Sequence, residues 1–274
     1  MYDAVKDFCK VKNKGTCLDN GSDPTPRVEF LLDLLERMGI EHHLDSFTSE
    51  RPTFAGSRPR WYDNRGQAKE QEENRLFNIV MPGSSGRMVV AHHDIVNPAS
   101  DNANDNSASC INAIALKRMV PELTVILFDG EEVGGLGSKH AASQILAGDH
   151  GSIEWVLNLE LTGRGGDKFF IGNYPGPLSS KIISMFDCPV FNTPFNDSVI
   201  LRAKGIDSTV INPLPPVMQP SKKEWMFEPV VMGGVELDTS ILMNCHSTKD
   251  SLSTISTDDM RVFVEEVLHK IVTS

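Results

Sequence analysis

Three short apolar runs in the middle of the chain constrain its fold more than any other feature. They are RMVVAH at 87–92, LTVILF at 123–128 and WVLNL at 155–159, and none of them has the period of a helix. Helix-like stretches lie between them, at about 107–119 and 138–146. Apolar strands that alternate with helices form a mostly parallel sheet with both faces covered. The sequence therefore predicts an α/β fold, a three-layer sandwich with a mostly parallel, mixed central sheet flanked by helices.

The remaining segments are expected to extend this sheet and cover it. Apolar residues recur at helical spacing over 26–39, and Pro26 suits the first turn of a helix there. Further strands and a closing helix are expected at 168–172, 198–201, 209–212 and 258–272. The length of 274 residues fits one domain, 1–274, with long surface loops near 49–76 and 213–236.

The charge balance limits the partners that this chain can have. Lys and Arg number 26 against 37 Asp and Glu, which gives a net charge of -11. Nucleic acids and anionic membranes bind clustered cations, so neither is an expected partner. No apolar run reaches the length of about eighteen residues that a membrane helix needs. The first residues lack the pattern of a signal peptide, and a cytoplasmic location is expected. The five cysteines are odd in number, with no CxxC pair, which argues against a disulfide scaffold.

Polar side chains follow each of the three apolar runs. Taken singly they have ordinary explanations, since an Asp before a helix usually caps it and a Glu-Glu pair usually lies in a solvated turn. Ligands of parallel sheets, however, bind beyond the carboxyl ends of the strands, so these side chains should converge on one crevice. So many carboxylates would repel one another without cations, and imidazoles combined with carboxylates suit zinc. In chain order they are His92, Asp94, Asp105, the pair Glu131 and Glu132, Glu160, and His246.

The order of these motifs and their exact residues are typical of one family. His-x-Asp at 92–94 is followed by NDNSAS at 104–109, FDGEEVGGLGS at 128–138 and, late in the chain, CHSTKDSLSTIS at 245–256. Over about 77–270 the chain resembles the co-catalytic di-zinc aminopeptidases, the family of the bacterial leucyl aminopeptidases and the related glutaminyl-peptide cyclases. The resemblance implies a phosphorylase/hydrolase-like fold and a zinc-dependent aminopeptidase acting on peptides.

The resemblance also implies two zinc ions per chain and their ligands. His92 and Glu160 would hold one metal, and Glu132 and His246 the other. Asp105 would bridge the two. Two metals arranged in this way share a water, which becomes a hydroxide near neutral pH, and polarise the scissile carbonyl.

Catalytic and substrate-binding roles follow from the same resemblance. Glu131 would be the general base acting on the bridging hydroxide, and Asp94 would orient the imidazole of His92. Adjacent residues of an extended chain point apart, so the two glutamates need a sharp bend, which the glycines that follow them allow. Asp197 is a candidate substrate contact, and Trp225 and Met226 are candidates for an apolar substrate pocket.

Three positions depart from the family pattern. Glu160 stands where Asp is usual, and Ser198 stands where a His usually follows the Asp. The segment before Asp105 reads Asn-Ala-Asn instead of the usual Gly-Ala, which makes Asp101 a competing candidate for the bridge.

Two other functions remain possible at this point. A glutaminyl-peptide cyclase, or a related amidohydrolase, would use a single zinc held by Asp105, Glu132 and His246. A non-catalytic binding domain would need no metal. The intact His92-x-Asp94 half favours two metals.

Overall fold

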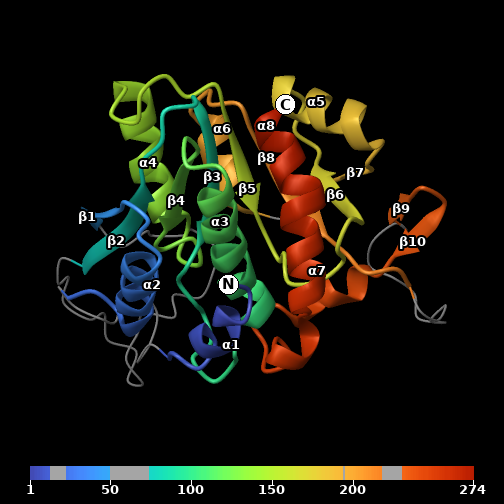
Figure 1. Cartoon of the computed structure of the whole chain (residues 1–274), viewed down its shortest axis with the longest axis horizontal. Helices are drawn as coiled ribbons and strands as arrows, with labels where there is room; N and C mark the ends of the chain where they lie inside the picture. Colours follow the sequence, from blue (N-terminus) through green and yellow to red (C-terminus); the bar gives the residue numbers. More distant parts are fainter. Residues whose placement is uncertain (13–22, 50–73, 194, 218–229) are drawn as a thin grey trace, which may run out of the picture.

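The computed structural model describes residues 1–12, 23–49, 74–193, 195–217 and 230–274 (Figure 1). Its centre is an eight-stranded sheet in the order β1-β2-β4-β3-β5-β8-β6-β7. Neighbours among β4, β3, β5 and β8 are parallel, while β1, β2 and β6 pair antiparallel with β2, β4 and β8. The predicted fold class is therefore confirmed. In chain order the strands are β1 His43–Ser49, β2 Asn74–Met81, β3 Arg87–His92, β4 Thr124–Phe128, β5 Trp155–Leu159, β6 Phe169–Gly172, β7 Val190–Phe191 and β8 Ser208–Pro213.

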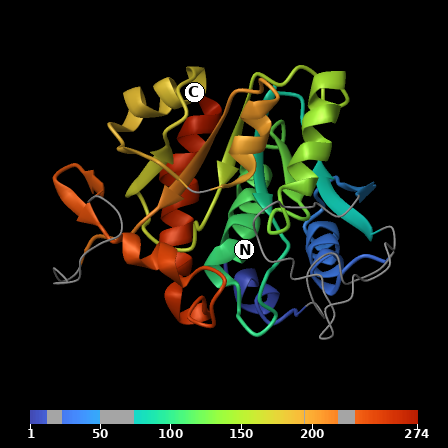
Figure 2. The same cartoon turned by 180° about the vertical axis from the view of Figure 1, so that it is seen from behind.

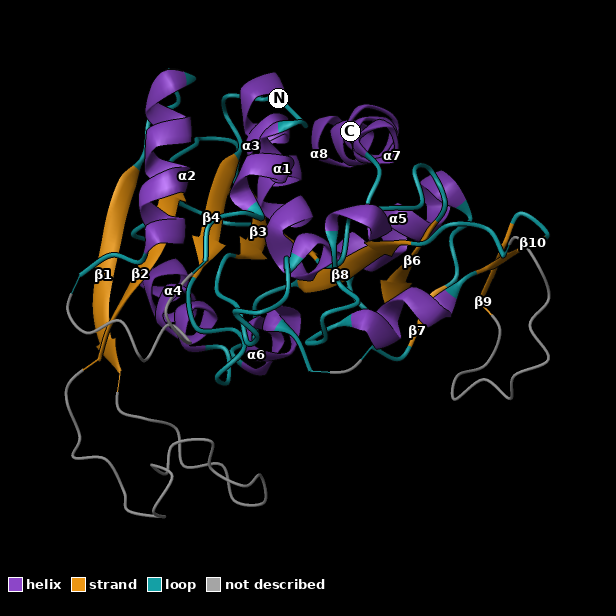
Figure 3. Ribbon diagram, turned by 90° about the horizontal axis from the view of Figure 1, so that it is seen from below, coloured by secondary structure: helices purple, strands orange, loops and turns teal. Residues whose placement is uncertain are grey.

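Helices cover both faces of the sheet, as Figure 3 shows. One face carries α1 Ala4–Phe8, α2 Pro26–Arg37, α3 Ala108–Met119, α5 Pro177–Phe186 and a closing helix made of α7 Thr257–Val262, η5 Phe263–Leu268 and α8 His269–Thr273. The other face carries α4 Leu136–Ala147 and α6 Asp197–Ala203. Figure 1 views the first face and Figure 2 the second. Short elements complete the described chain: η2 Ala103–Ser107, η3 Thr239–Asn244, η4 Leu252–Thr254 and the hairpin of β9 Val230–Met232 and β10 Val235–Leu237.

The register of the central strands brings their carboxyl ends to one edge. His92, the last residue of β3, pairs with Phe128, the last residue of β4. On the other side of β3, Val90 pairs with Asn158 of β5. Every residue of β4 and β5 is buried, as both faces of the sheet are covered. The segments that follow β3, β4 and β5 therefore leave the sheet side by side.

One predicted strand is wrong: residues 198–201 lie in helix α6. A run of four apolar or small residues is too short for its periodicity to distinguish a strand from a helix. The residue in front decides, because the Asn196 side chain accepts a hydrogen bond from the Ser198 N–H at 2.9 Å and so caps the helix. Strand β1 and helix α5 were not anticipated from the sequence, and β2 begins inside the segment expected to be a surface loop.

The two long loops predicted near 49–76 and 213–236 lie in large part outside the described residues. Within the second of them, the described portion includes the hairpin of β9 and β10. None of the helices in the described ranges combines the length and the apolar character that spanning a membrane would require.

Candidate metal centre

A first group of potential ligands forms where β3 and β5 end. The Nε2 atom of His92 lies 3.3 Å from Oδ1 of Asp105 and 3.6 Å from Oε2 of Glu160. All three side chains are buried. Glu160 directly follows β5, and its carbonyl accepts a hydrogen bond from the Asn212 side chain at 2.8 Å. One nitrogen and two carboxylate oxygens thus face one another closely enough to hold a cation.

A second group uses the other oxygen of the same aspartate. The Nε2 atom of His246 lies 2.9 Å from Oε2 of Glu132 and 3.3 Å from Oδ2 of Asp105. The His246 side chain is 52% exposed, so this half of the centre is the more open one. Its backbone has a φ of 61°, an uncommon conformation for a residue with a side chain and one that clusters at functional sites. Asp105 therefore joins two groups of three residues through its two oxygens.

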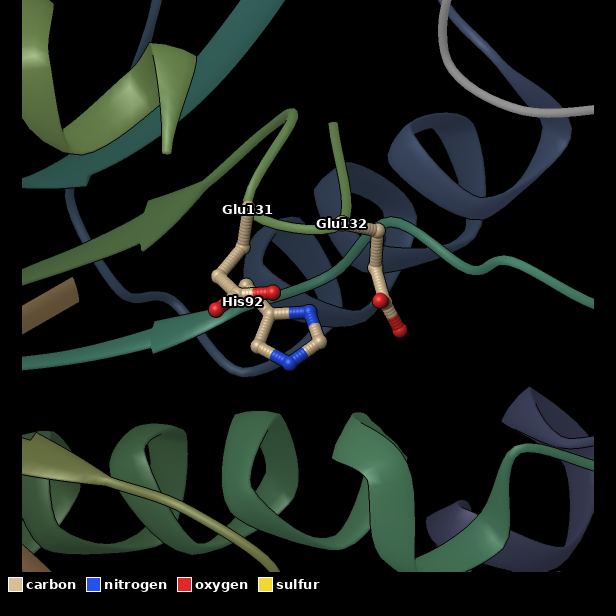
Figure 4. A group of neighbouring side chains, drawn as sticks. All are labelled: His92, Glu131 and Glu132. Carbon is tan, nitrogen blue, oxygen red and sulfur yellow. The ribbon is translucent and has the colours of Figure 1, made fainter. Parts of the chain in front are cut away.

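Glu131 belongs to neither of these groups but lies against both. One of its carboxylate oxygens is within 4.8 Å of a His92 ring nitrogen and of a Glu132 oxygen. Figure 4 shows both glutamates extending to the same side of the bend after β4, Glu131 over His92 and Glu132 beside the imidazole ring. The structure thus gives adjacent glutamates a common orientation, which an extended chain would not.

The carboxylate of Asp94 holds this bend in place. Its two oxygens accept the backbone N–H groups of Glu131 and Glu132, both at 3.1 Å. Its Oδ1 also lies 3.3 Å from Nδ1 of His92. One buried carboxylate therefore orients the imidazole of β3 and the glutamates after β4 together.

Glycines make the bend sterically possible. Gly130, Gly134 and Gly135 have φ values of 74°, 109° and 66°, which residues with a Cβ rarely adopt. Gly137 acts differently, through close packing, because a Cβ there would lie 2.5 Å from the side chain of Asn78. The positive φ angles of Gly134 and Gly135 agree with the expectation that the glycines after the two glutamates allow the bend.

The turn that carries Asp105 is held by hydrogen bonds from three directions. Asp250 accepts the backbone N–H groups of Asn104 and Asp105 at 2.8 and 3.0 Å. The side-chain oxygen of Asn104 accepts the Gly163 N–H at 2.8 Å, and the Asn106 amide donates to the Leu159 carbonyl at 3.0 Å. The sequence reasoning assigned no role to Asp250, although it lies in the motif that contains His246.

The charges of the centre favour a bound cation. Burial raises the pKa of Glu131 well above its usual range and that of Glu132 to about 7, with the nearby Asp105 charge adding to the latter. The hydrogen bond that the His246 ring donates to the Glu132 carboxylate raises the pKa of His246 to about 9. Burial lowers the pKa of His92, but the Glu160 charge and its other acidic neighbours outweigh burial and hold it well above its usual range. Raised pKa values of this kind reflect burial and the mutual repulsion of the crowded carboxylates, and a bound metal ion would relieve that repulsion.

Asp197, the predicted substrate contact, lies near this cluster at the first turn of α6. Its side chain is fully buried, and burial raises its pKa to about 7 while the neighbouring His92 acts in the opposite direction. The next residue, Ser198, accepts a hydrogen bond from the Ser208 hydroxyl at 3.0 Å. The predicted pocket residues Trp225 and Met226 lie outside the described residues.

The side chains of Asp101, the competing candidate for the bridge, and of His93, the neighbour of His92, have partners outside the two ligand groups. Asp101 accepts the Leu252 N–H at 3.0 Å and pairs with Lys12 at 3.3 Å, so it faces η4. His93 places its Nε2 2.9 Å from the Phe77 carbonyl, and burial lowers its pKa to about 4. The structure therefore brings Asp105, and not Asp101, between His92 and His246.

Solved structures with the same fold include enzymes of two kinds. A zinc-dependent exopeptidase from Parabacteroides distasonis is 15% identical, with a TM-score of 0.66 over 100% of this chain and 97% of that one. A glutaminyl cyclase from Fimbriiglobus ruber is 16% identical, with a TM-score of 0.65 over 99% and 93%. A zinc aminopeptidase from Bacillus subtilis is 18% identical, with a TM-score of 0.54 over 75% of this chain. The present chain spans about half, 51%, of that aminopeptidase. At these identities the likeness is one of fold.

No curated protein sequence matches this chain. The family model of peptidase family M28 matches residues 79–270, which include the three strand ends and the whole candidate centre. This match confirms the family resemblance of the motifs, and the chain belongs to peptidase family M28.

Proposed function

We propose that this chain is a zinc-dependent aminopeptidase that hydrolyses the N-terminal peptide bond of peptides and binds two zinc ions. The observation that carries the proposal is the position of Asp105. Its two oxygens each lie 3.3 Å from the Nε2 atom of a different histidine, His92 on one side and His246 on the other. A carboxylate shared in this way is the arrangement that a pair of metal ions requires.

The donor atoms fit zinc. Each group offers one imidazole nitrogen and two carboxylate oxygens, which are preferred zinc ligands and leave a coordination position for water or substrate. Bound there, two zinc ions would acidify a water molecule and polarise the scissile carbonyl. The single imidazole nitrogen in each half also separates this site from calcium and magnesium sites, whose ligands are oxygens.

Glu131 is the residue proposed to move the proton. Its buried carboxylate lies beside both groups without completing either, so it is free to accept a proton from the attacking water. It then returns that proton to the amine that leaves. Burial raises the pKa of Glu131, which makes its carboxylate a stronger proton acceptor than an exposed glutamate.

Recognition of a free N-terminus requires an anionic group near the cleaved bond. Asp197 is proposed to receive the substrate's ammonium group, since its carboxylate is fully buried close to the charged cluster. Its carboxylate interacts with the Ser138 hydroxyl, which lowers its pKa, but neither oxygen makes a hydrogen bond of good geometry to a described residue. An ammonium group would satisfy such a carboxylate. Trp225 and Met226 remain the predicted apolar lining of the substrate pocket.

A glutaminyl-peptide cyclase is the second candidate. Asp105, Glu132 and His246 by themselves form a complete group for a single zinc, and the fold is shared with a glutaminyl cyclase. The aminopeptidase is favoured because His92 and Glu160 duplicate this group around the other oxygen of Asp105.

The proposal is tested by metal content and by substrate. Purified protein is assayed by elemental mass spectrometry, and aminoacyl anilides and glutaminyl peptides are supplied with and without a chelator. Two zinc ions per chain and chelator-sensitive release of the N-terminal residue are expected. One zinc ion per chain together with cyclisation of glutaminyl peptides would show that the chain is a cyclase and not an aminopeptidase. No zinc and no turnover after zinc addition would leave a binding domain and refute both enzymes.

A further inference from the structure

Arg27, in the first turn of α2, has an unusual environment for a charged side chain. It is completely buried, and it lies outside the residues that the family model matches. Its Nε donates to the His93 carbonyl and its Nη2 donates to the Ser107 hydroxyl, both at 2.9 Å. The guanidinium group lies 3.8 Å from the centre of the Phe8 ring of α1. Nη1 has no hydrogen-bond partner among the described residues. A buried cation of this kind is costly, so its retention calls for a reason.

The two acceptors of Arg27 belong to two of the three segments that carry the first metal-binding group. The His93 carbonyl lies in the chain between His92 and Asp94, at the end of β3. Ser107 follows Asp105 by two residues, and its hydroxyl donates to the Asn102 carbonyl across the same turn at 2.6 Å. One rigid guanidinium fork therefore links the strand that ends in His92 to the turn that carries Asp105.

The second group is held by other contacts. The Asp105 turn has an independent support in Asp250, which accepts two of its backbone N–H groups. The backbone of Glu132 is held by Asp94, which lies one residue beyond His93. Loss of Arg27 would remove the link between the end of β3 and the Asp105 turn. Asp250 would still hold Asp105, and the end of β3 would keep the hydrogen bond from the His93 N–H to the Phe128 carbonyl at 2.9 Å.

We propose that Arg27 is a positioning residue that fixes His92 relative to Asp105 and so maintains the His92 half of the metal centre. This inference rests on the proposed function. It makes the N-terminal helices α1 and α2, through Phe8 and Arg27, part of the unit that builds the site, although both helices precede the matched residues.

The test measures zinc affinity separately in each half. The background variant H246A retains the His92 half, and H92A retains the His246 half. Into each background we introduce R27K and S107A. R27K keeps the positive charge but cannot donate both hydrogen bonds of the planar guanidinium group, and S107A removes one acceptor of Arg27. The matched control is R37K on the same helix, where Arg37 is exposed and pairs with Asp33 at 2.9 Å. Zinc affinity is measured by competition with a chromophoric chelator, and thermal unfolding is recorded for the metal-free forms.

We expect R27K to weaken zinc binding about 10- to 100-fold in the H246A background, the range found when groups that orient a ligand are lost. In the H92A background the change should be clearly smaller, because Asp250 still holds Asp105, the ligand that both halves share. S107A should act in the same direction with a smaller effect, and R37K should change neither affinity. In the otherwise native enzyme, R27K should lower kcat and leave KM nearly unchanged.

Equal zinc affinity of R27K and its parent in the H246A background, with only a lower unfolding temperature, would overturn the inference and leave Arg27 a purely structural residue. If R27K does not fold, S107A decides by the same comparison. An unaltered protein that binds two zinc ions, together with silent variants, refutes the role of Arg27 alone. An unaltered protein that binds no zinc refutes the proposed function and this inference with it.

Discussion

Asp250 holds Asp105 by its backbone. One oxygen of the Asp250 carboxylate accepts the Asp105 N–H at 3.0 Å, and the other accepts the preceding N–H of Asn104 at 2.8 Å. Asp94 binds the successive N–H groups of Glu131 and Glu132 in the same manner. Irregular backbone leaves such N–H groups without the partners that a helix or strand provides, and a carboxylate is a strong acceptor for them. Two buried aspartates thus shape the two turns that present ligand candidates.

The substitution D250N should damage both halves of the metal centre. An amide offers one acceptor oxygen in place of two, so one buried N–H loses its partner, at a cost of about 1–3 kcal/mol. Zinc affinity should fall about 10- to 100-fold in both halves, because the displaced Asp105 serves both. Chelator competition and thermal unfolding measure the two effects. The control is D258N, since Asp258 is 91% exposed on α7. Unchanged zinc affinity would show that Asp250 does not position Asp105.

The neighbouring variants E131Q and E132Q should separate catalysis from metal binding. E131Q should retain two zinc ions and lose about 10²- to 10⁴-fold in kcat, because an amide cannot take up the proton. E132Q should lose zinc from the half that contains His246, because its Oε2 lies 2.9 Å from that imidazole. Turnover and metal content are measured on the same preparations. Zinc loss in E131Q, or full activity without zinc loss in E132Q, would contradict the assigned roles.

The variant E160D tests the departure from the aspartate that is usual at this position. In this chain Glu160 reaches to 3.6 Å from Nε2 of His92 from a backbone fixed by the Asn212 side chain. A side chain shorter by one methylene would not reach as far, and zinc affinity in the His92 half should fall at least about tenfold. The measurement is chelator competition in the H246A background. Equal or tighter binding would mean that the end of β5 can move to accommodate either residue.

The metal-free protein should lose stability as pH rises. Glu132 and Asp197 have folded pKa values of about 7, above their ordinary values near 4, so the folded state binds more protons over that range. The folded pKa of His246 is raised to about 9, so its stabilisation is complete below about 6.5 and disappears as pH rises to 9. For all three groups, the stability of the folded protein falls as pH rises.

The unfolding temperature of chelated protein should therefore decrease from about pH 5 to about pH 9. With zinc bound this decrease should shrink, because the ligands release their protons to bind metal. A rising unfolding temperature over the same range in the chelated protein would contradict the protonation of these groups in the folded state.

Much of the sheet could be predicted from the sequence, because strands buried on both faces need continuous apolar residues. The runs at 87–92, 123–128 and 155–159 became β3, β4 and β5 almost without change. The run at 198–201 did not, since four residues carry no period and the cap at Asn196 made them a helix. Strand β1, with its mixed polar and apolar residues, pairs along its length with β2, and only this pairing in the folded chain identifies it as a strand.

The sequence by itself determined which side chains follow the strands. Parallel neighbouring strands bring their carboxyl ends to one edge, so His92, Glu131, Glu132 and Glu160 had to lie close together. The motif favoured Asp105 over Asp101, and the tertiary structure places Asp105 between the two histidines. Only the tertiary structure gave roles to Arg27 and Asp250. Their positions depend on hydrogen bonds between segments that are 66 to 146 residues apart in the chain. No local pattern encodes such distances, because they arise only when the sheet and its helices have packed.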